Sequence, residues 1–285
     1  MCIQCSAMHF SANIDCRVAP ADWGPADPNP FNYDGTLGRS WSAFCVFVDG
    51  YEYMPVKRMD SGLNAVHLNQ DRPDLLVRLA DFLRYEAYWS RTVILKVPKG
   101  CDGDALVKEA LDSTPLPHLR RPDDQLWGVH STSLASWKLI QEDGELLSCA
   151  RLQRAGRSQG GLGLTSFGEP EDYSEYVMLG FGIGPEHVVA SQAAGVVITE
   201  EHRPYSPGVR LFFDVGRIIE DGLLVRDGVH KMKVFSHLPL DPYLVASVTA
   251  SDCDPDTTVD TWTPHTFMTA ATEHFEKVLS SDEIR

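Results

Sequence analysis

The sequence lacks any apolar run long enough to span a lipid bilayer, and it lacks a basic segment followed by an apolar one near its start. Both absences predict a cytoplasmic protein without a membrane partner. Positive charge is also scarce, because 25 lysines and arginines stand against 40 acidic residues, for a formal net charge of −15. Proteins that coat nucleic acids are usually basic, so this charge argues against a broad nucleic-acid-binding surface.

The placement of the cysteines favours neither a disulfide framework nor a metal site. The chain has seven cysteines, an odd number, scattered over 285 residues, whereas disulfide-rich domains carry densely spaced pairs. Cys2, Cys5, His9 and Cys16 lie near the start, but they lack the regular second ligand pair of a zinc site. We therefore expect reduced thiols and no metal.

The composition is that of a folded globular protein, with 43% hydrophobic and 23% charged residues. Turn-forming residues dominate residues 1–40, which predicts an irregular arm. Residues 42–56 carry β-branched and aromatic residues around Asp49-Gly50, which predicts a hairpin. The arm and the hairpin together form the expected N-terminal region, residues 1–70.

Residues 71–118 show a helix–strand–helix pattern. Leucines and a phenylalanine recur at helical spacing over residues 71–89, with Asp71 as a cap. Residues 91–98 are typical of a strand, and residues 101–113 are typical of an amphipathic helix. A proline-punctuated linker over residues 114–124 marks the expected domain boundary.

Strands alternate with short helices after Leu126. A strand is expected at 126–130, followed by a helix over 133–143 that Gly144 ends. Further strands are expected over 194–201, 209–215 and 240–249, and a hairpin over 223–235. The remaining residues, 251–285, predict an acidic tail with one helix.

Two stretches of this second half resemble known enzymes. "LWGVHSTSLASWKLIQEDG" resembles the opening of the ADP-ribosyltransferase fold, where a strand ends in His-Gly-Thr or a variant and a short helix follows. "GLGLTSF" and "DYSEYV" resemble the glycine-rich strand and tyrosine-bearing helix that come next in that fold. "VRLFFDVGRIIEDGLLVRDGVHKMKVF" is similar to the end of the RNA 2′-phosphotransferases, and the helices before residue 114 are similar to their winged-helix lobe.

The resemblance implies an α+β protein with a winged-helix-like lobe over residues 71–118 and a split-sheet, ADP-ribosyltransferase-like catalytic lobe over residues 119–250. It implies NAD as the cofactor. The expected reaction moves an RNA 2′-phosphate onto ADP-ribose with release of nicotinamide. The alternatives are an ADP-ribosyltransferase, of effector or toxin type, that modifies a protein, nucleic acid or small molecule, and an inactive nucleotide- or protein-binding module of the same fold.

The resemblance also selects candidate site residues. The cofactor-binding candidates offer hydroxyls, an imidazole, a guanidinium or a ring to NAD: His130, Ser131, Thr132, Arg151, Thr165, Ser166, Tyr173 and Tyr176. The catalytic candidates carry groups that stabilise anionic phosphate: Arg154, Arg157, His230 and Arg84. Simpler interpretations stay open, because Ser131 or Ser133 can cap a helix, the arginines can form a solvated loop, and one tyrosine can belong to the core.

The chain departs from the RNA 2′-phosphotransferase pattern at two places. Arg84 is followed by Tyr85 where the family has histidine, and the Arg-Ala-x-Gln-Gly-His segment between the lobes is missing. The protein-modifying branch has a late glutamate, whereas residues 238–244 offer only Asp241. These departures favour the alternative of an inactive module.

Overall fold

A computed structural model describes residues 13–31, 41–49, 53–59, 63–157, 170–229, 232–253 and 262–281, with the backbone alone for residues 53–58. Contacts within the chain divide it into two units. Unit 1 comprises Met1–Leu119, Phe167–Tyr173 and Val225–Lys231, and unit 2 comprises Arg120–Ser166, Ser174–Leu224 and Met232–Arg285. The protein is of mixed α+β class, and unit 1 draws on three separate stretches of the sequence.

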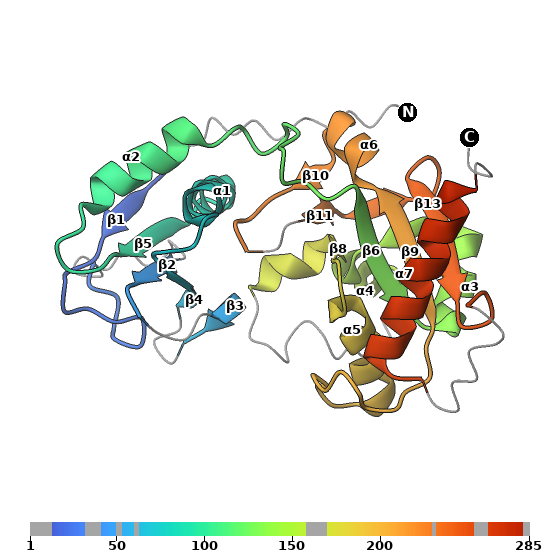
Figure 1. Ribbon diagram of the computed structural model, residues 1–285. Coiled ribbons are helices and arrows are strands. Elements are labelled where there is room, and N and C mark those ends of the chain that lie inside the picture. The colour runs from blue at the N-terminus through green and yellow to red at the C-terminus, as the bar shows by residue number, and fades with distance from the viewer. Residues whose placement is uncertain are drawn as a thin grey trace. The chain divides into compact units, whose positions relative to one another are not determined.

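Unit 1 is built on a five-stranded, mostly parallel sheet (Figure 1). Its strands are β1 (Cys16–Val18), β2 (Trp41–Phe47), β3 (Tyr53–Arg58), β4 (Asn64–Asn69) and β5 (Thr92–Lys96), in the order β1-β5-β2-β4-β3. Strand β3 runs antiparallel to β4, and the other pairs are parallel. The central strands β2 and β5 bury nearly every residue, as parallel strands covered on both faces do.

Two predictions about unit 1 are wrong. Residues 42–56 do not form a hairpin, because β2 pairs with β4 and β5 whereas β3 pairs with β4. Residues 71–118 do not form a separate winged-helix-like lobe, because helices α1 (Leu75–Tyr88) and α2 (Gly103–Ser113) belong with the sheet of the preceding residues. Phe82 of α1 packs on Phe44 of β2 with 5.4 Å between ring centroids.

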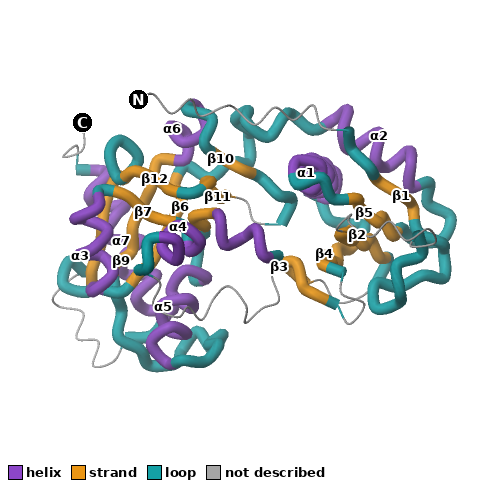
Figure 2. Tube along the Cα trace, turned by 180° about the vertical axis from the view of Figure 1, so that it is seen from behind, coloured by secondary structure: helices purple, strands orange, loops and turns teal. Residues whose placement is uncertain are grey.

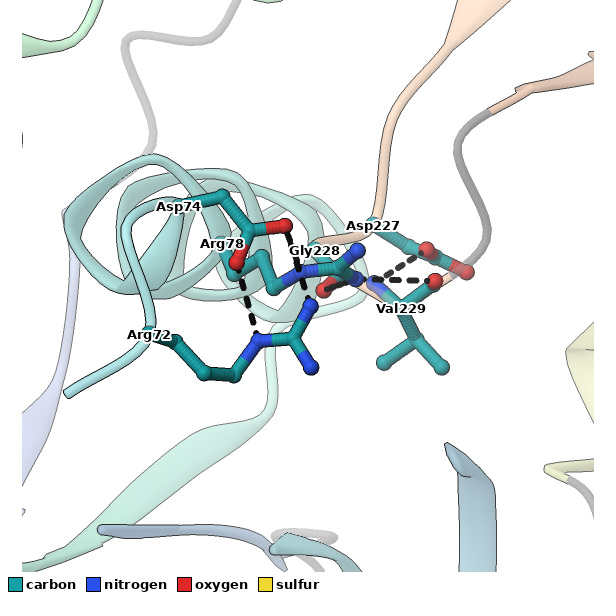
Figure 3. Close-up of polar contacts among 6 residues, drawn as sticks. All are labelled: Arg72, Asp74, Arg78, Asp227, Gly228 and Val229. Atoms are coloured by element: carbon teal, nitrogen blue, oxygen red, sulfur yellow. Dashed lines mark hydrogen bonds and ion pairs between the residues drawn. The ribbon is translucent and has the colours of Figure 1, made fainter. Parts of the chain in front are cut away.

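Helix α1 also contacts Gly228 and Val229, which come from much later in the sequence (Figure 3). Arg78 donates from Nε to Asp74 Oδ2 at 2.7 Å and from Nη1 to the carbonyls of Gly228 and Val229 at 3.0 and 3.2 Å. Gly228 has φ of 74°, and a Cβ there would lie 2.1 Å from the carbonyl oxygen of Arg78. The turn can approach the helix this closely only with glycine at this position.

The described part of unit 2 contains two three-stranded sheets and a two-stranded ribbon. The first sheet, in the order β13-β9-β6, is antiparallel and consists of β6 (Trp127–Thr132), β9 (Val209–Asp214) and β13 (Leu244–Thr249). The second has the order β10-β11-β8, from β8 (Tyr176–Leu179), β10 (Leu224–Val225) and β11 (Met232–Phe235). The ribbon pairs β7 (Glu145–Leu147) with β12 (His237–Pro239), and a bridge between Val129 and Gly180 connects β6 to the residue after β8.

Helices flank these strands (Figure 2). They are α3 (Leu134–Asp143), α4 (Cys149–Arg154), α5 (Gly184–Ala194), α6 (Val215–Glu220) and α7 (Pro264–Ser280), and a 3-10 turn covers Glu171–Glu175. Helix α7 lies along β9 and β13 (Figure 1), and its Phe275 stacks on Phe212 with 3.9 Å between ring centroids. The helix within the predicted acidic tail is therefore part of the core of unit 2.

Most predicted elements after Leu126 are confirmed. Strand β6, helix α3, strand β9 and the adjacent strands β10 and β11 form where the sequence predicts them. Gly144 ends α3 in the left-handed conformation at φ of 71°. The strand predicted over residues 194–201 is absent from these described residues, because α5 runs to Ala194 and Gly195 ends it.

Candidate functional site

The candidate site lies at the end of β6. Side chains alternate between the two faces of a strand. Val129 packs in the same core cluster as Phe212 and Phe275, whereas a Cβ at Gly128 would contact Leu179 and Val215 of a different cluster. The side chain of His130 therefore lies on the Gly128 face of the strand, and the side chain of Ser131 lies on the opposite face.

His130 is held as a neutral hydrogen-bond acceptor. Its Nδ1 lies 3.3 Å from the carbonyl oxygen of Met178 on β8. Because a carbonyl only accepts, Nδ1 carries the proton in this contact and Nε2 keeps its lone pair. Burial lowers the pKa of His130 below its usual value, and the hydrogen bond to Met178 opposes the shift. The residue as a whole is partly exposed, whereas the imidazole itself has buried surroundings.

The side chain of Ser131 does not extend this site. The Ser131 hydroxyl donates to Glu186 Oε1 at 2.7 Å on the face opposite to the histidine, and both residues are buried. A Cβ at Gly208 would lie 1.8 Å from the Thr132 carbonyl oxygen, so the chain passes directly against the strand end. The cap of α3 is Ser133. This corrects the predicted place of the Ser131 hydroxyl in a cofactor pocket.

A buried ion pair behind Ser131 was missed by the sequence analysis. Glu186 of α5 is fully buried, and its Oε1 accepts from Arg210 Nη1 at 2.5 Å. Arg210 is 2% exposed and also donates from Nη2 to the carbonyl of Gly182 at 3.1 Å. Tyr205 donates to the other oxygen of Glu186 at 3.4 Å. The available signal was an arginine inside the apolar strand "VRLFFDV", where burial forces it to find a carboxylate.

The three arginines predicted to contact phosphate lie on α4 or just after it. Each is paired with a carboxylate of unit 2: Arg151 with Glu145 at 3.3 Å, Arg154 with Glu175 at 2.8 Å, and Arg157 with Asp143 at 2.7 Å. Their side chains are 38%, 61% and 35% exposed. The predicted local excess of positive charge is thus offset by acidic partners, which a phosphate would have to displace.

The two tyrosines predicted to stack on nicotinamide are core residues, each 3% exposed. Tyr173 lies in unit 1, edge-on to Tyr85 with 6.3 Å between centroids. Tyr176 lies on β8, edge-on to Phe235, and Lys233 Nζ is 4.5 Å from the centre of its ring. Rings packed in this way are not open to a ligand, which corrects the stacking prediction for both.

Arg84 has a structural role in unit 1. Its guanidinium donates to the carbonyls of Leu111, Thr114 and Pro115 at 3.2, 3.0 and 2.9 Å. These carbonyls lie at the C-terminal end of α2, where helical carbonyls lack partners within the helix. Arg84 therefore caps α2, and its buried guanidinium is not available for the predicted catalytic role.

The remaining predicted site residues, Thr165, Ser166 and His230, lie outside the described residues, as do Cys2, Cys5 and His9. Where the structure does describe the chain, no three His, Cys, Asp or Glu side chains are grouped to hold a metal ion. No helix of that described part combines the length and apolarity needed to cross a membrane.

Comparisons with known proteins neither support nor contradict the resemblance to the ADP-ribosyltransferases. No family model, no curated protein and no solved structure matches the chain. The geometry around His130 and the sequence pattern are therefore the observations that bear on function.

Proposed function

We propose that unit 2 binds NAD at the end of β6 and transfers ADP-ribose from it, as a module of the ADP-ribosyltransferase type. One observation carries the proposal: His130 is neutral, with Nδ1 bonded to the Met178 carbonyl and a lone pair left on Nε2. Such an acceptor suits a ribose hydroxyl. The split arrangement of strands around it supports the same proposal.

In this reaction the main role of the protein is to hold the ribose in place. A nucleophile of the acceptor forms a bond to the ribose carbon that carries nicotinamide. The bond between that carbon and the ring nitrogen breaks, and nicotinamide leaves as a neutral molecule with the electron pair. The proton of the acceptor passes to water. His130 acts as a ribose contact that orients the reacting carbon, and orientation of this kind lowers the barrier.

The negative net charge of the chain favours a protein or small molecule over RNA as the acceptor. An RNA 2′-phosphate would have to replace the carboxylates that now hold Arg151, Arg154 and Arg157, and it would approach a chain of net charge −15. RNA 2′-phosphotransfer is the second candidate. The bidentate contact of Arg154 with Glu175 favours it, because phosphate binds arginine in the same geometry.

The test incubates the full chain with NAD labelled in its adenylate part, with and without RNA that carries a 2′-phosphate. Release of nicotinamide without RNA, with label on an acceptor, is the expected result. Release only with that RNA identifies the second candidate, and NAD binding without turnover identifies an inactive module. If calorimetry detects no binding of NAD, the proposal is wrong.

A pair of histidine variants tests the site itself. His130→Ala is expected to weaken NAD binding about tenfold, which corresponds to the net value of one hydrogen bond. His265→Ala removes an exposed histidine on α7 of the same unit and is the matched control. An unchanged dissociation constant in His130→Ala would remove His130 from the site.

A further inference from the structure

The orientation of His130 depends on how β6 meets the end of β8. The contact between His130 and Met178 joins the two strands. On one side of this contact, the backbones of Val129 and Gly180 exchange two hydrogen bonds, at 2.9 and 2.8 Å. This bridge fixes the distance between the strands next to His130 but leaves the following residues to other contacts.

The buried ion pair supplies a second tie, which runs from the residue after His130 to the chain beyond the bridge. Ser131, the residue after His130, donates to Glu186 Oε1, which also accepts from Arg210. Arg210 in turn donates to the carbonyl of Gly182, two positions after the bridge. The bridge and this chain of three polar bonds therefore connect both sequence neighbours of His130, Val129 and Ser131, to the segment from Gly180 to Glu186.

A contribution to stability does not by itself explain the buried Glu186–Arg210 pair. Burying both charges carries a large desolvation cost, and apolar replacements of buried ion pairs are often equally stable or more stable. Arg210 Nε has no hydrogen-bond partner within the described chain, so the guanidinium is not fully satisfied. Its two bonded nitrogens reach two different segments, the start of α5 and the chain before it, which an apolar side chain could not tie to β6.

We propose that the Glu186–Arg210 pair is a positioning device for His130, which acts through Ser131 and Gly182 to keep the imidazole bonded to Met178. Both residues are positioning residues, because their side chains lie on the face of β6 opposite to the histidine. The effect on His130 stands by itself, whereas its use in binding ribose rests on the proposed function.

The main test replaces the pair with apolar residues of similar size, Glu186→Leu together with Arg210→Met. The unfolding temperature is expected to stay within about 5 °C of the wild type or to rise. The side-chain nitrogen spectrum of His130, assigned with His130→Gln, is expected to change from one tautomer to a mixture. The pKa of His130 is expected to move toward its usual value, and NAD binding to weaken at least fivefold.

A milder variant covers the case in which the double variant does not fold. Ser131→Ala removes the tie between the strand and the ion pair while leaving both charges paired. It is expected to shift the His130 signals in the same direction with a smaller amplitude. Thr272→Val is the control, because it removes a half-buried hydrogen bond within α7 of the same unit.

The readouts separate this proposal from the proposed function. If the His130 spectrum moves in either variant while the wild type fails to bind NAD, the positioning role holds and the NAD proposal fails. If the double variant folds and His130 keeps its tautomer and pKa, the positioning role is wrong. If the double variant does not fold, an unchanged spectrum in Ser131→Ala overturns it.

Discussion

Arginines on or just after α1 and arginines on α4 all pair with carboxylates, but those near α1 are buried whereas Arg154 on α4 is exposed. On and just after α1, Arg78 and Arg91 have side chains that are 9% and 10% exposed. Arg154 on α4 is 61% exposed although it too pairs with a carboxylate. In the interior each bond is needed to offset desolvation, whereas an exposed pair contributes little and exchanges readily with water.

The comparison teaches where a ligand can be recruited. A buried arginine that already serves two partners holds the fold, as Arg91 does with Glu86 and Asp172. An exposed arginine with one local partner can release it for a phosphate at small cost. The sequence alone does not show whether an arginine is buried or exposed in this sense, because the difference lies in its partners and in its burial.

The largest effect is expected for Arg91→Met, which leaves Glu86 and Asp172 buried without their cation. We expect the free energy of unfolding to fall by about 3–5 kcal/mol at neutral pH. Burial already raises the pKa of Glu86 and Arg91 opposes this, so without Arg91 the folded state takes up a proton more readily than the unfolded state. The deficit relative to wild type should therefore shrink as the pH falls, as urea unfolding can measure. A deficit that grows on acidification would contradict this account.

Gly228→Ala tests how tightly the turn approaches α1. Its Cβ would lie 2.1 Å from a backbone oxygen, and φ of 74° is already strained for alanine. We expect a loss of about 3 kcal/mol from strain and overpacking together. Gly100→Ala in the same unit is the matched control, because φ is 92° with no atom in contact, and about 1 kcal/mol is expected there. Equal losses in the two variants would show that the close approach does not matter.

Asp74 should make the stability of unit 1 depend on acid. Burial opposes the shift, but hydrogen bonds and charge from Arg72 and Arg78 outweigh it and lower the pKa of Asp74 to about 2. The unfolded chain binds this proton first, so the stabilisation is present above the ordinary pKa of about 4 and is lost toward pH 2. Asp74→Asn should cost about 2 kcal/mol at neutral pH and progressively less below about pH 4. A constant difference between the two proteins from neutral to acid pH would refute the assignment.

The smallest effect on stability is expected for Arg154→Met. Its exposed pair with Glu175 should contribute little to the free energy of unfolding, and salt should reduce this contribution further. Chemical unfolding at low and high ionic strength measures the contribution. A loss of stability comparable to that of Arg91→Met would show that the exposed and the buried arginine pairs contribute alike.

Local signals in the sequence were sufficient for many elements. The leucines of α1 recur at helical spacing, Gly144 ends α3, and Asp227-Gly228 lies in the turn between β10 and β11. Each of these features depends on residues that are close together in the sequence, so it can be predicted without knowledge of the tertiary structure. The hairpin predicted over residues 42–56 failed because β4 and β5, from later in the chain, are better partners for β2.

The sequence by itself determined the α+β class, the strand that carries His130 and the hydroxyls that follow it. Only the tertiary structure decided which of these hydroxyls is hydrogen-bonded within the protein. The partner of Ser131 is Glu186, which lies 55 positions away along the chain. It also decided that the arginines of α4 are paired and that Arg84 caps α2. Partners of buried charges come from distant segments that meet only on folding, and burial makes those partners obligatory.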